Sequence, residues 1–303
     1  MNKLKIFIIL TGYQFTWLAC VFGEKYFLNL GIYIGLIYLA LYLYFSKNKK
    51  RSIYAVSLDA SKTILAESNM SVSIYAQFAS LIGKTIDPIS AEEVSLGNGF
   101  IPFGLSTKLG PARFKFEYRM MPSGKFEFGY WDRSYEIERA TFSSSFMNDN
   151  SGLRTGEIIT KDSRLGKFGK QKGYFSTLSI DLGEMVGASM SYQNLFGEQW
   201  NENESNFNND RNQSFIAGIR LKKPISKITN ARWYYQQRNV PDPFDFEFTE
   251  STISGYRVGI KLGNGMILNY IFRQSFRDID GDGKVNGKDE TINMTSIETS
   301  FSF

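Results

Sequence analysis

The 303-residue sequence contains no histidine and only one cysteine, Cys20. Without histidine, Ser-His-Asp and Cys-His nucleophilic systems and the usual zinc ligands are excluded. A single cysteine forms no disulfide within the chain. No glycine-rich loop follows a strand pattern and opens a helix, as nucleotide phosphates require. We therefore expect no enzyme, and we expect Glu136 and Glu138 to face solvent or basic partners rather than act as an acid–base pair.

Most of the chain also has no excess of basic over acidic residues, although the formal net charge is +5. Residues 1–51 hold seven basic residues and one acid, whereas the remainder holds 28 basic and 29 acidic residues. The excess charge belongs to the N-terminal segment. The sequence therefore gives no reason to expect nucleic acid as a partner.

What the sequence has in quantity is alternation of apolar and polar residues. In residues 113–120, four aromatic or apolar side chains alternate with four charged ones. The same period of two recurs in later segments and runs to the last residue, Phe303. A period of two is that of a strand with one apolar face, and no helical period fits these segments.

Twelve strands are predicted, near residues 70–80, 100–109, 112–121, 124–132, 135–145, 173–182, 185–195, 213–222, 227–238, 254–262, 265–276 and 291–303. Their lengths are near the roughly 9–11 residues with which a tilted strand crosses a bilayer. A hairpin at residues 52–67 would raise the count to fourteen. One long strand over 124–145 would make the count odd, and an even number would then require dropping the weak strand at 70–80, which leaves ten. Short glycine turns are expected at one end, and long polar connections at the other, over residues 146–172, 196–212, 239–252 and 277–290.

The terminal Phe303, the period of two and the turn asymmetry resemble the general class of Gram-negative outer-membrane β-barrels, over residues 70–303. The resemblance implies a membrane all-β fold, an antiparallel transmembrane β-barrel of about 12 strands (10–14), preceded by one or two hydrophobic helices. It also implies a lipid bilayer around the protein, an outer-membrane location and recognition of the last strand by the outer-membrane assembly machinery. The same pattern leaves open a large soluble β-sandwich or solenoid with an aromatic core.

Residues 1–51 carry a different pattern, with one apolar run from Ile6 to Gly23 and another from Tyr26 to Phe45. The first run is typical of a signal peptide, and the second is long enough for a transmembrane helix. Together they resemble the helical hairpin of small bacterial inner-membrane proteins. Three regions are predicted: a hydrophobic leader at 1–51, a linker or extra hairpin at 52–69 and a β-barrel at 70–303.

The flanking lysines and arginine of this hairpin would place both of its ends in the cytoplasm, which conflicts with a barrel in the outer membrane. The first run could be cleaved, or the second could fail to span. The interpretation we favour is a fused or misassigned leader ahead of a barrel that lost its own signal.

Basic residues gather on the polar face of the predicted strands and are expected to line a pore. They are Lys108, Arg113, Lys115, Arg119, Arg220, Arg232, Arg257, Lys261 and Arg273. A basic lumen favours anions, so the sequence predicts a passive porin or channel for small solutes, with anions preferred. If these charges instead pair with one another, the barrel is closed and has a structural or adhesive role. A soluble β-protein anchored to the inner membrane by the N-terminal helices is the third alternative.

Residues 278–289 match the template of a calcium-binding loop and resemble the single loops of EF-hand and dockerin modules. The predicted ligands are Asp278, Asp280, Asp282, the main-chain carbonyl of Lys284, and Asp289. One exposed loop would bind Ca²⁺ weakly, with a dissociation constant of roughly 10⁻⁴–10⁻³ M. Its expected role is to order a surface loop, and the alternative is an acidic hairpin tip without metal.

Overall fold

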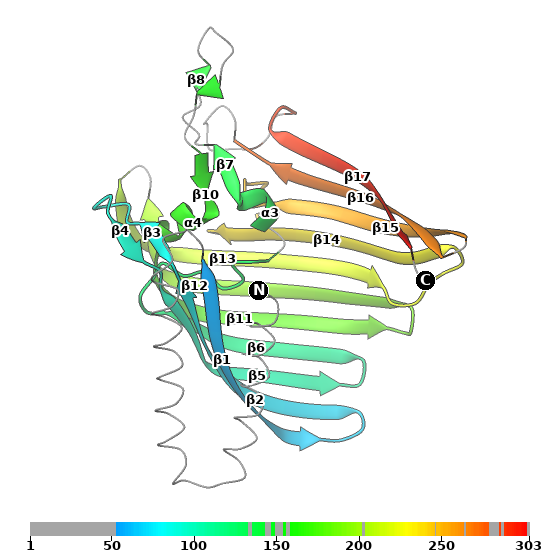
Figure 1. Ribbon diagram of the computed structural model, residues 1–303. Coiled ribbons are helices and arrows are strands. Elements are labelled where there is room, and N and C mark those ends of the chain that lie inside the picture. The colour runs from blue at the N-terminus through cyan, green and yellow to red at the C-terminus, as the bar shows by residue number, and fades with distance from the viewer. Residues whose placement is uncertain are drawn as a thin grey trace.

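The computed structural model describes residues 53–132, 135–142, 147–148, 154–155, 158–201, 204–245, 247–263, 265–278, 285 and 288–301. Over these residues the protein is mainly one antiparallel sheet of eleven strands, which neighbour one another in chain order (Figure 1). The strands are β1 (Tyr54–Ala66), β2 (Met70–Ile82), β5 (Asn98–Leu109), β6 (Ala112–Met121), β11 (Phe168–Leu182), β12 (Val186–Asn201), β13 (Asn206–Leu221), β14 (Ile228–Val240), β15 (Ile253–Gly263), β16 (Met266–Phe276) and β17 (Thr291–Phe301).

The connections differ in length between the two ends of the sheet, as the sequence predicts. At one end, β5 and β6 are joined through Gly110, which adopts φ 53°, and β11 and β12 through Gly183, which adopts φ 62°. At the other end, residues 122–167 separate β6 from β11, and residues 241–252 separate β14 from β15. The prediction of a long loop at 196–212 is wrong. β12 and β13 remain paired along their length, up to the pair Asn201 and Asn206.

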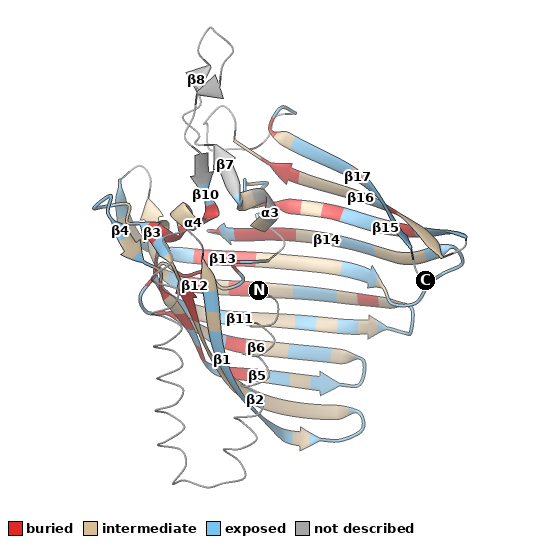
Figure 2. Cartoon of the chain, viewed as in Figure 1, coloured by how far each residue is buried: buried red, intermediate tan, exposed pale blue. Residues whose placement is uncertain are grey.

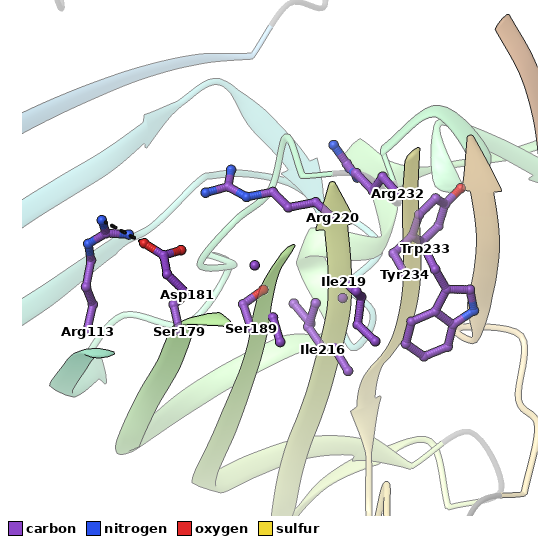
Figure 3. Close-up of a pocket in the computed structure, with 14 residues that line it drawn as sticks. Arg113, Ser179, Asp181, Ser189, Ile216, Ile219, Arg220, Arg232, Trp233 and Tyr234 are labelled. Atoms are coloured by element: carbon purple, nitrogen blue, oxygen red, sulfur yellow. Dashed lines mark hydrogen bonds and ion pairs between the residues drawn. The ribbon is translucent and has the colours of Figure 1, made fainter. Parts of the chain in front are cut away.

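Two faces follow from the alternation. We call the inner face the one that carries Arg113, Arg220 and Arg232, whose side chains point into the same space in Figure 3. The opposite, outer face carries large apolar residues that remain exposed, among them Phe114, Met190, Ile219, Tyr256 and Ile297. This is the reverse of a soluble sheet, in which the apolar face is the buried one.

Burial is concentrated at the end of the sheet where the long connections lie, as Figure 2 shows. The apolar cluster there is small, and consists of Leu81, Met121, Phe126, Tyr130, Leu165 and Leu195. Polar and charged residues outnumber apolar ones among the buried side chains of the described residues. The interior of this protein is therefore built largely from hydrogen bonds and ion pairs.

The strands predicted at 124–132 and 135–145 are wrong. Residues 122–132 contain no strand, and the following residues form α3 (Tyr135–Glu138) and β7 (Ala140–Phe142). The alternation of Phe126 and Phe128 with Glu127 imitates a strand, but Gly124 and Lys125 adopt φ of 61° and 52° and turn the chain back. Lys125 N then donates to Phe168 O at 2.5 Å, at the start of β11.

Short elements complete the long-connection end. Within the described residues they are the hairpin of β3 (Lys84–Ile86) and β4 (Glu93–Ser95), the pairs β7 with β10 (Ile158–Thr160) and β8 (Met147–Asn148) with β9 (Arg154–Thr155), α4 (Lys161–Arg164) and the 3-10 turn η1 (Leu165–Lys167). Figure 1 shows α3, α4, β7 and β10 gathered at this end of the sheet.

The first and last strands of the sheet each have one partner within the described residues: β1 pairs with β2, and β17 pairs with β16. β1 occupies most of the segment expected as a linker or extra hairpin. The predicted leader at 1–51 and the terminal Phe303 lie outside the described residues. Within the described part of the chain, no helix combines the length and apolar character that crossing a membrane requires.

Candidate functional site: the inner face of the sheet

The structure places all nine of the predicted pore-lining residues on the inner face. Directly paired residues of neighbouring strands share a face. The register pairs Lys108 with Arg113, Arg220 with Arg232, and Arg232 with Arg257. Lys115 and Arg119 follow Arg113 at even spacing along β6, and Lys261 follows Arg257 along β15. Arg273 is opposite Gly255, which is opposite the inner-face residue Tyr234.

Three of these residues form a continuous row across β13, β14 and β15, which we call the arginine row: Arg220, Arg232 and Arg257. All three side chains are exposed. Neighbouring strands lie about 4.8 Å apart, and like charges directly opposite each other destabilise a sheet. An arrangement of this kind is unfavourable unless water or an anion screens it.

One carboxylate near the arginine row is shared between two other cations, and another pairs with a member of the row. Asp181 Oδ2 is 3.0 Å from Lys222 Nζ and 3.5 Å from Arg113 Nη2. Glu298 Oε2 is 3.5 Å from Arg257 Nη2, with both side chains about half exposed. Within the described residues Arg232 contacts no carboxylate, and its guanidinium carbon lies 5.8 Å from the ring centre of Tyr234.

A pocket of about 310 Å³ opens beside the row (Figure 3). Its charged lining residues are Arg113, Asp181, Arg220 and Arg232. Small residues of β12 and β13 form part of its wall, including Gly187 and Gly218. A Cβ at Gly187 would lie 3.4 Å from Arg220 Nε and 3.5 Å from Asp181 Oδ1, so larger side chains here would narrow the space between the charged groups.

Residues 122–132, which we call the crossing segment, lie across the other end of the inner face. The guanidinium carbon of Arg119 on β6 lies 4.7 Å from the ring centre of Phe128. On β14, Arg238 Nη2 donates to Phe128 O at 2.7 Å, and Arg238 Nη1 donates to Gly129 O at 3.3 Å. Because β11, β12 and β13 separate β6 from β14, the segment spans the inner face over five strands.

Buried ion pairs hold the crossing segment in place. Arg238 is 2.9 Å from Glu127 Oε1 and 2.7 Å from Asp132 Oδ2, and its side chain is 5% exposed. Lys161 of α4, equally buried, reaches Glu127 at 3.6 Å and Glu138 at 2.6 Å. Each buried cation therefore meets two carboxylates, which offsets the loss of hydration.

A hydrogen bond joins the crossing segment to α4. Tyr130 donates a hydrogen bond to Asp162 of α4. Burial, together with that hydrogen bond, raises the pKa of Tyr130, so its hydroxyl stays protonated. On β6, Glu117 is 1% exposed and contacts Lys115 at 2.5 Å and Arg119 at 2.6 Å. The two predicted pore-lining residues of this group are thus paired, unlike Arg232.

The sequence pattern does not predict the ion pairs that hold the crossing segment, among Glu127, Asp132, Lys161 and Arg238, because the pattern predicts a strand over residues 124–132. The available signal was the run Pro122-Ser-Gly-Lys, in which proline and glycine favour a turn over a strand.

The predicted calcium loop is described only in part. Asp280, Asp282 and Lys284 lie outside the described residues, whereas Asp278 and Asp289 lie within them. The flanks of the loop are joined by a hydrogen bond from Arg277 N to Glu290 O at 2.8 Å. In the part of the chain that the structure describes, no three His, Cys, Asp or Glu groups gather as metal ligands would. Calcium binding stays a prediction.

Comparison with known proteins gives matches among solved structures, one of which is a porin. No family model matches the chain. No curated protein matches it. The NanC porin, solved in a rhombohedral crystal form, aligns with 84% of this chain and 95% of its own chain, at 10% sequence identity and a TM-score of 0.32. A TM-score this low assigns neither fold nor function, so both are argued from the chain itself.

Proposed function

We propose that the sheet is the wall of an outer-membrane β-barrel that acts as a passive channel for small solutes and prefers anions. The observation that carries the proposal is the inverted distribution of residues: apolar side chains on the exposed outer face, and charged and polar ones on the inner face. Monomeric soluble proteins rarely expose contiguous apolar surface of this extent, whereas lipid covers it in a membrane barrel.

Aromatic residues on the outer face support the same conclusion. Tyr174 of β11, Tyr192 of β12 and Phe215 of β13 stand on three consecutive strands. The ring centres of Tyr174 and Tyr192 are 6.0 Å apart, and Phe244 of the β14–β15 connection lies 5.3 Å from Tyr192 and 5.5 Å from Phe215. A belt of aromatic residues is what outer-membrane barrels place at the membrane–water interface.

The anion preference rests on the inner face. Exposed cations there exceed the carboxylates that contact them, and the excess is greatest at the arginine row. Rings of Arg and Lys select anions in other pores. The crossing segment narrows the passage at the long-connection end, so we expect a small conductance rather than that of a wide pore.

The test is reconstitution of the purified full-length chain in planar bilayers under a potassium chloride gradient. Stepwise conductance with a reversal potential on the chloride side is expected. The matched variant Arg220→Gln/Arg232→Gln/Arg257→Gln should conduct with a weaker anion preference, and Arg211→Gln, on the outer side of β13, should not differ from wild type. Absence of stepwise conductance from protein that shows heat-modifiable gel mobility would contradict the channel.

That last outcome would favour a second candidate, a closed structural barrel. The observation behind it is the buried ion network of Arg238, Lys161 and Glu127, which holds the crossing segment across one end of the inner face. In this proposal the predicted Ca²⁺ loop orders the surface connections. Calcium should then protect the β16–β17 connection from proteolysis without any conductance.

A further inference from the structure

The arginine row has a more specific chemistry than a general excess of positive charge. Arg220 and Arg232 are directly opposite each other, and so are Arg232 and Arg257. Guanidinium groups are planar forks of N–H donors, and each binds an oxyanion through two parallel hydrogen bonds. Three forks on adjacent strands therefore offer more donors in one small area than a single carboxylate accepts.

Two of the three arginines of the row, Arg220 and Arg232, have no carboxylate within ion-pair distance among the described residues. Glu298 contacts the third, Arg257, at 3.5 Å, and the nearby Asp181 is already bound by Lys222 and Arg113. Arg232 in the middle contacts an aromatic ring but no carboxylate. A doubly charged ligand at this position would relieve the repulsion between the opposed arginines.

Space for such a ligand is present. The pocket beside Arg220 and Arg232 is about 310 Å³, near the lower limit of the volumes that hold small molecules. Gly187 and Gly218 line the pocket without side chains, so a tetrahedral group could approach both guanidinium groups. Figure 3 shows Arg220 and Arg232 on the same side of the sheet as Asp181.

We propose that Arg220, Arg232 and Arg257 bind a phosphate-type dianion, either inorganic phosphate or the phosphate group of a monoester. A tetrahedral dianion has enough oxygen atoms to bridge two or three guanidinium forks, whereas a monocarboxylate satisfies one. The inference deepens the proposed channel function, because the row would be the docking point of its solute. Binding itself requires only the register of β13, β14 and β15, and no open passage.

The first experiment is calorimetric titration of the detergent-solubilised full-length chain with inorganic phosphate. Saturable binding is expected for wild type, weakened at least about tenfold in Arg232→Gln, because each hydrogen bond to a charged group is strong enough for such a change. Arg232→Lys keeps the charge without the fork and should bind with intermediate affinity. Arg211→Gln should bind like wild type. Each variant is first checked for heat-modifiable gel mobility, which shows that the β-sheet is folded.

Two ligand controls test the specificity. Sulfate, a tetrahedral dianion, should compete with phosphate, whereas acetate at the same concentration should not. Equal affinity for acetate and phosphate, or unchanged phosphate affinity in folded Arg232→Gln, would overturn the inference. A monoester such as glycerol phosphate distinguishes the two sources: if it binds as tightly as inorganic phosphate, the row accepts the group on a larger solute.

Failure of the inference and failure of the channel give different results. Anion-selective conductance with no effect of Arg232→Gln on phosphate binding would leave the channel standing and remove the phosphate site. Phosphate binding that depends on Arg232, in protein without conductance, would keep the site and remove the channel. Should both hold, phosphate should reduce chloride current in wild type more than in Arg232→Gln.

Discussion

β14 carries two arginines on its inner face, Arg232 and Arg238, and the structure holds them in opposite ways. Arg238 is buried and bound by two carboxylates and two main-chain carbonyls. Arg232 is exposed, flanked by two further arginines, and contacts no carboxylate of the described residues. The same side chain on the same strand thus has a structural role where its charge is matched, and is available to a ligand where it is not.

The largest expected effect is the difference between Arg238→Met and Arg232→Met. Arg238→Met removes the closer of the two cations of buried Glu127 and also the ion pair with partly buried Asp132, so the free energy of unfolding should fall by about 3–5 kcal/mol. Arg232→Met relieves like-charge repulsion at an exposed site and should change stability by less than about 0.5 kcal/mol. Equilibrium urea unfolding of both variants in the same detergent measures the difference.

The two variants should also differ in function: Arg238→Met should change the conductance, whereas Arg232→Met should change the anion preference. Arg238→Met releases the crossing segment, so conductance in planar bilayers should rise while selectivity changes little. Arg232→Met should keep the conductance and lose part of the anion preference. Equal losses of stability in the two variants would contradict the distinction between the two ends of the inner face.

A second, smaller effect tests whether the inner face meets water while the outer face meets lipid. Ile297 on β17 is 66% exposed, and its neighbour Ser296 is on the inner face, in register with Ile271. Arginine on the lipid face of a barrel costs about 2–4 kcal/mol near the midplane. Ile297→Arg should therefore lower the free energy of unfolding in lipid vesicles by roughly that amount, and Ser296→Arg should have a much smaller effect. A similar result for both variants would argue against a lipid-covered outer face.

The sequence pattern predicts which residues lie on the inner and outer faces of the strands, but it does not predict the arginine row. The period of two is local, so residues 113–120 could be assigned to one strand, β6, with Arg113 on its polar side. The opposition of Arg220, Arg232 and Arg257 depends on the register between strands, which turns and bulges determine. One such irregularity lies between Ile228 and Asn230, and no pattern in the sequence fixes its position.

The crossing segment could not be predicted for a different reason. Its alternation is that of a strand, and its actual course depends on contacts with distant residues. Arg238 binds the carbonyl of Gly129 across a sequence separation of 109 residues. Tertiary contacts of this kind override a local pattern of only a few residues.

The smallest expected effect concerns the long-connection end, where Asp87 anchors the crossing segment through Lys125 Nζ at 3.1 Å. The backbone N–H of Ser90, the side-chain ammonium of Lys125 and the backbone N–H of Ile89 hold the pKa of Asp87 below its usual value. A carboxylate with a lowered pKa stabilises the fold at pH values above its unfolded pKa of about 3.9, and that contribution is lost as the pH falls through the lower, folded value. Because the pair is partly exposed, its contribution should be below about 1 kcal/mol.

Asp87→Asn isolates this contribution. Wild type should be slightly more stable than the variant at neutral pH. The difference should begin to shrink below about pH 4 and should disappear once the pH is below the lowered, folded pKa of Asp87. Urea midpoints measured between neutral pH and pH 3 report the convergence. Asparagine keeps an Oδ1 acceptor for the N–H groups of Ser90 and Ile89, so a difference that persists unchanged in acid would mean that the charge of Asp87 does not make the contribution. The arginine row, at the opposite end of the inner face, should bind phosphate equally well in both proteins at neutral pH.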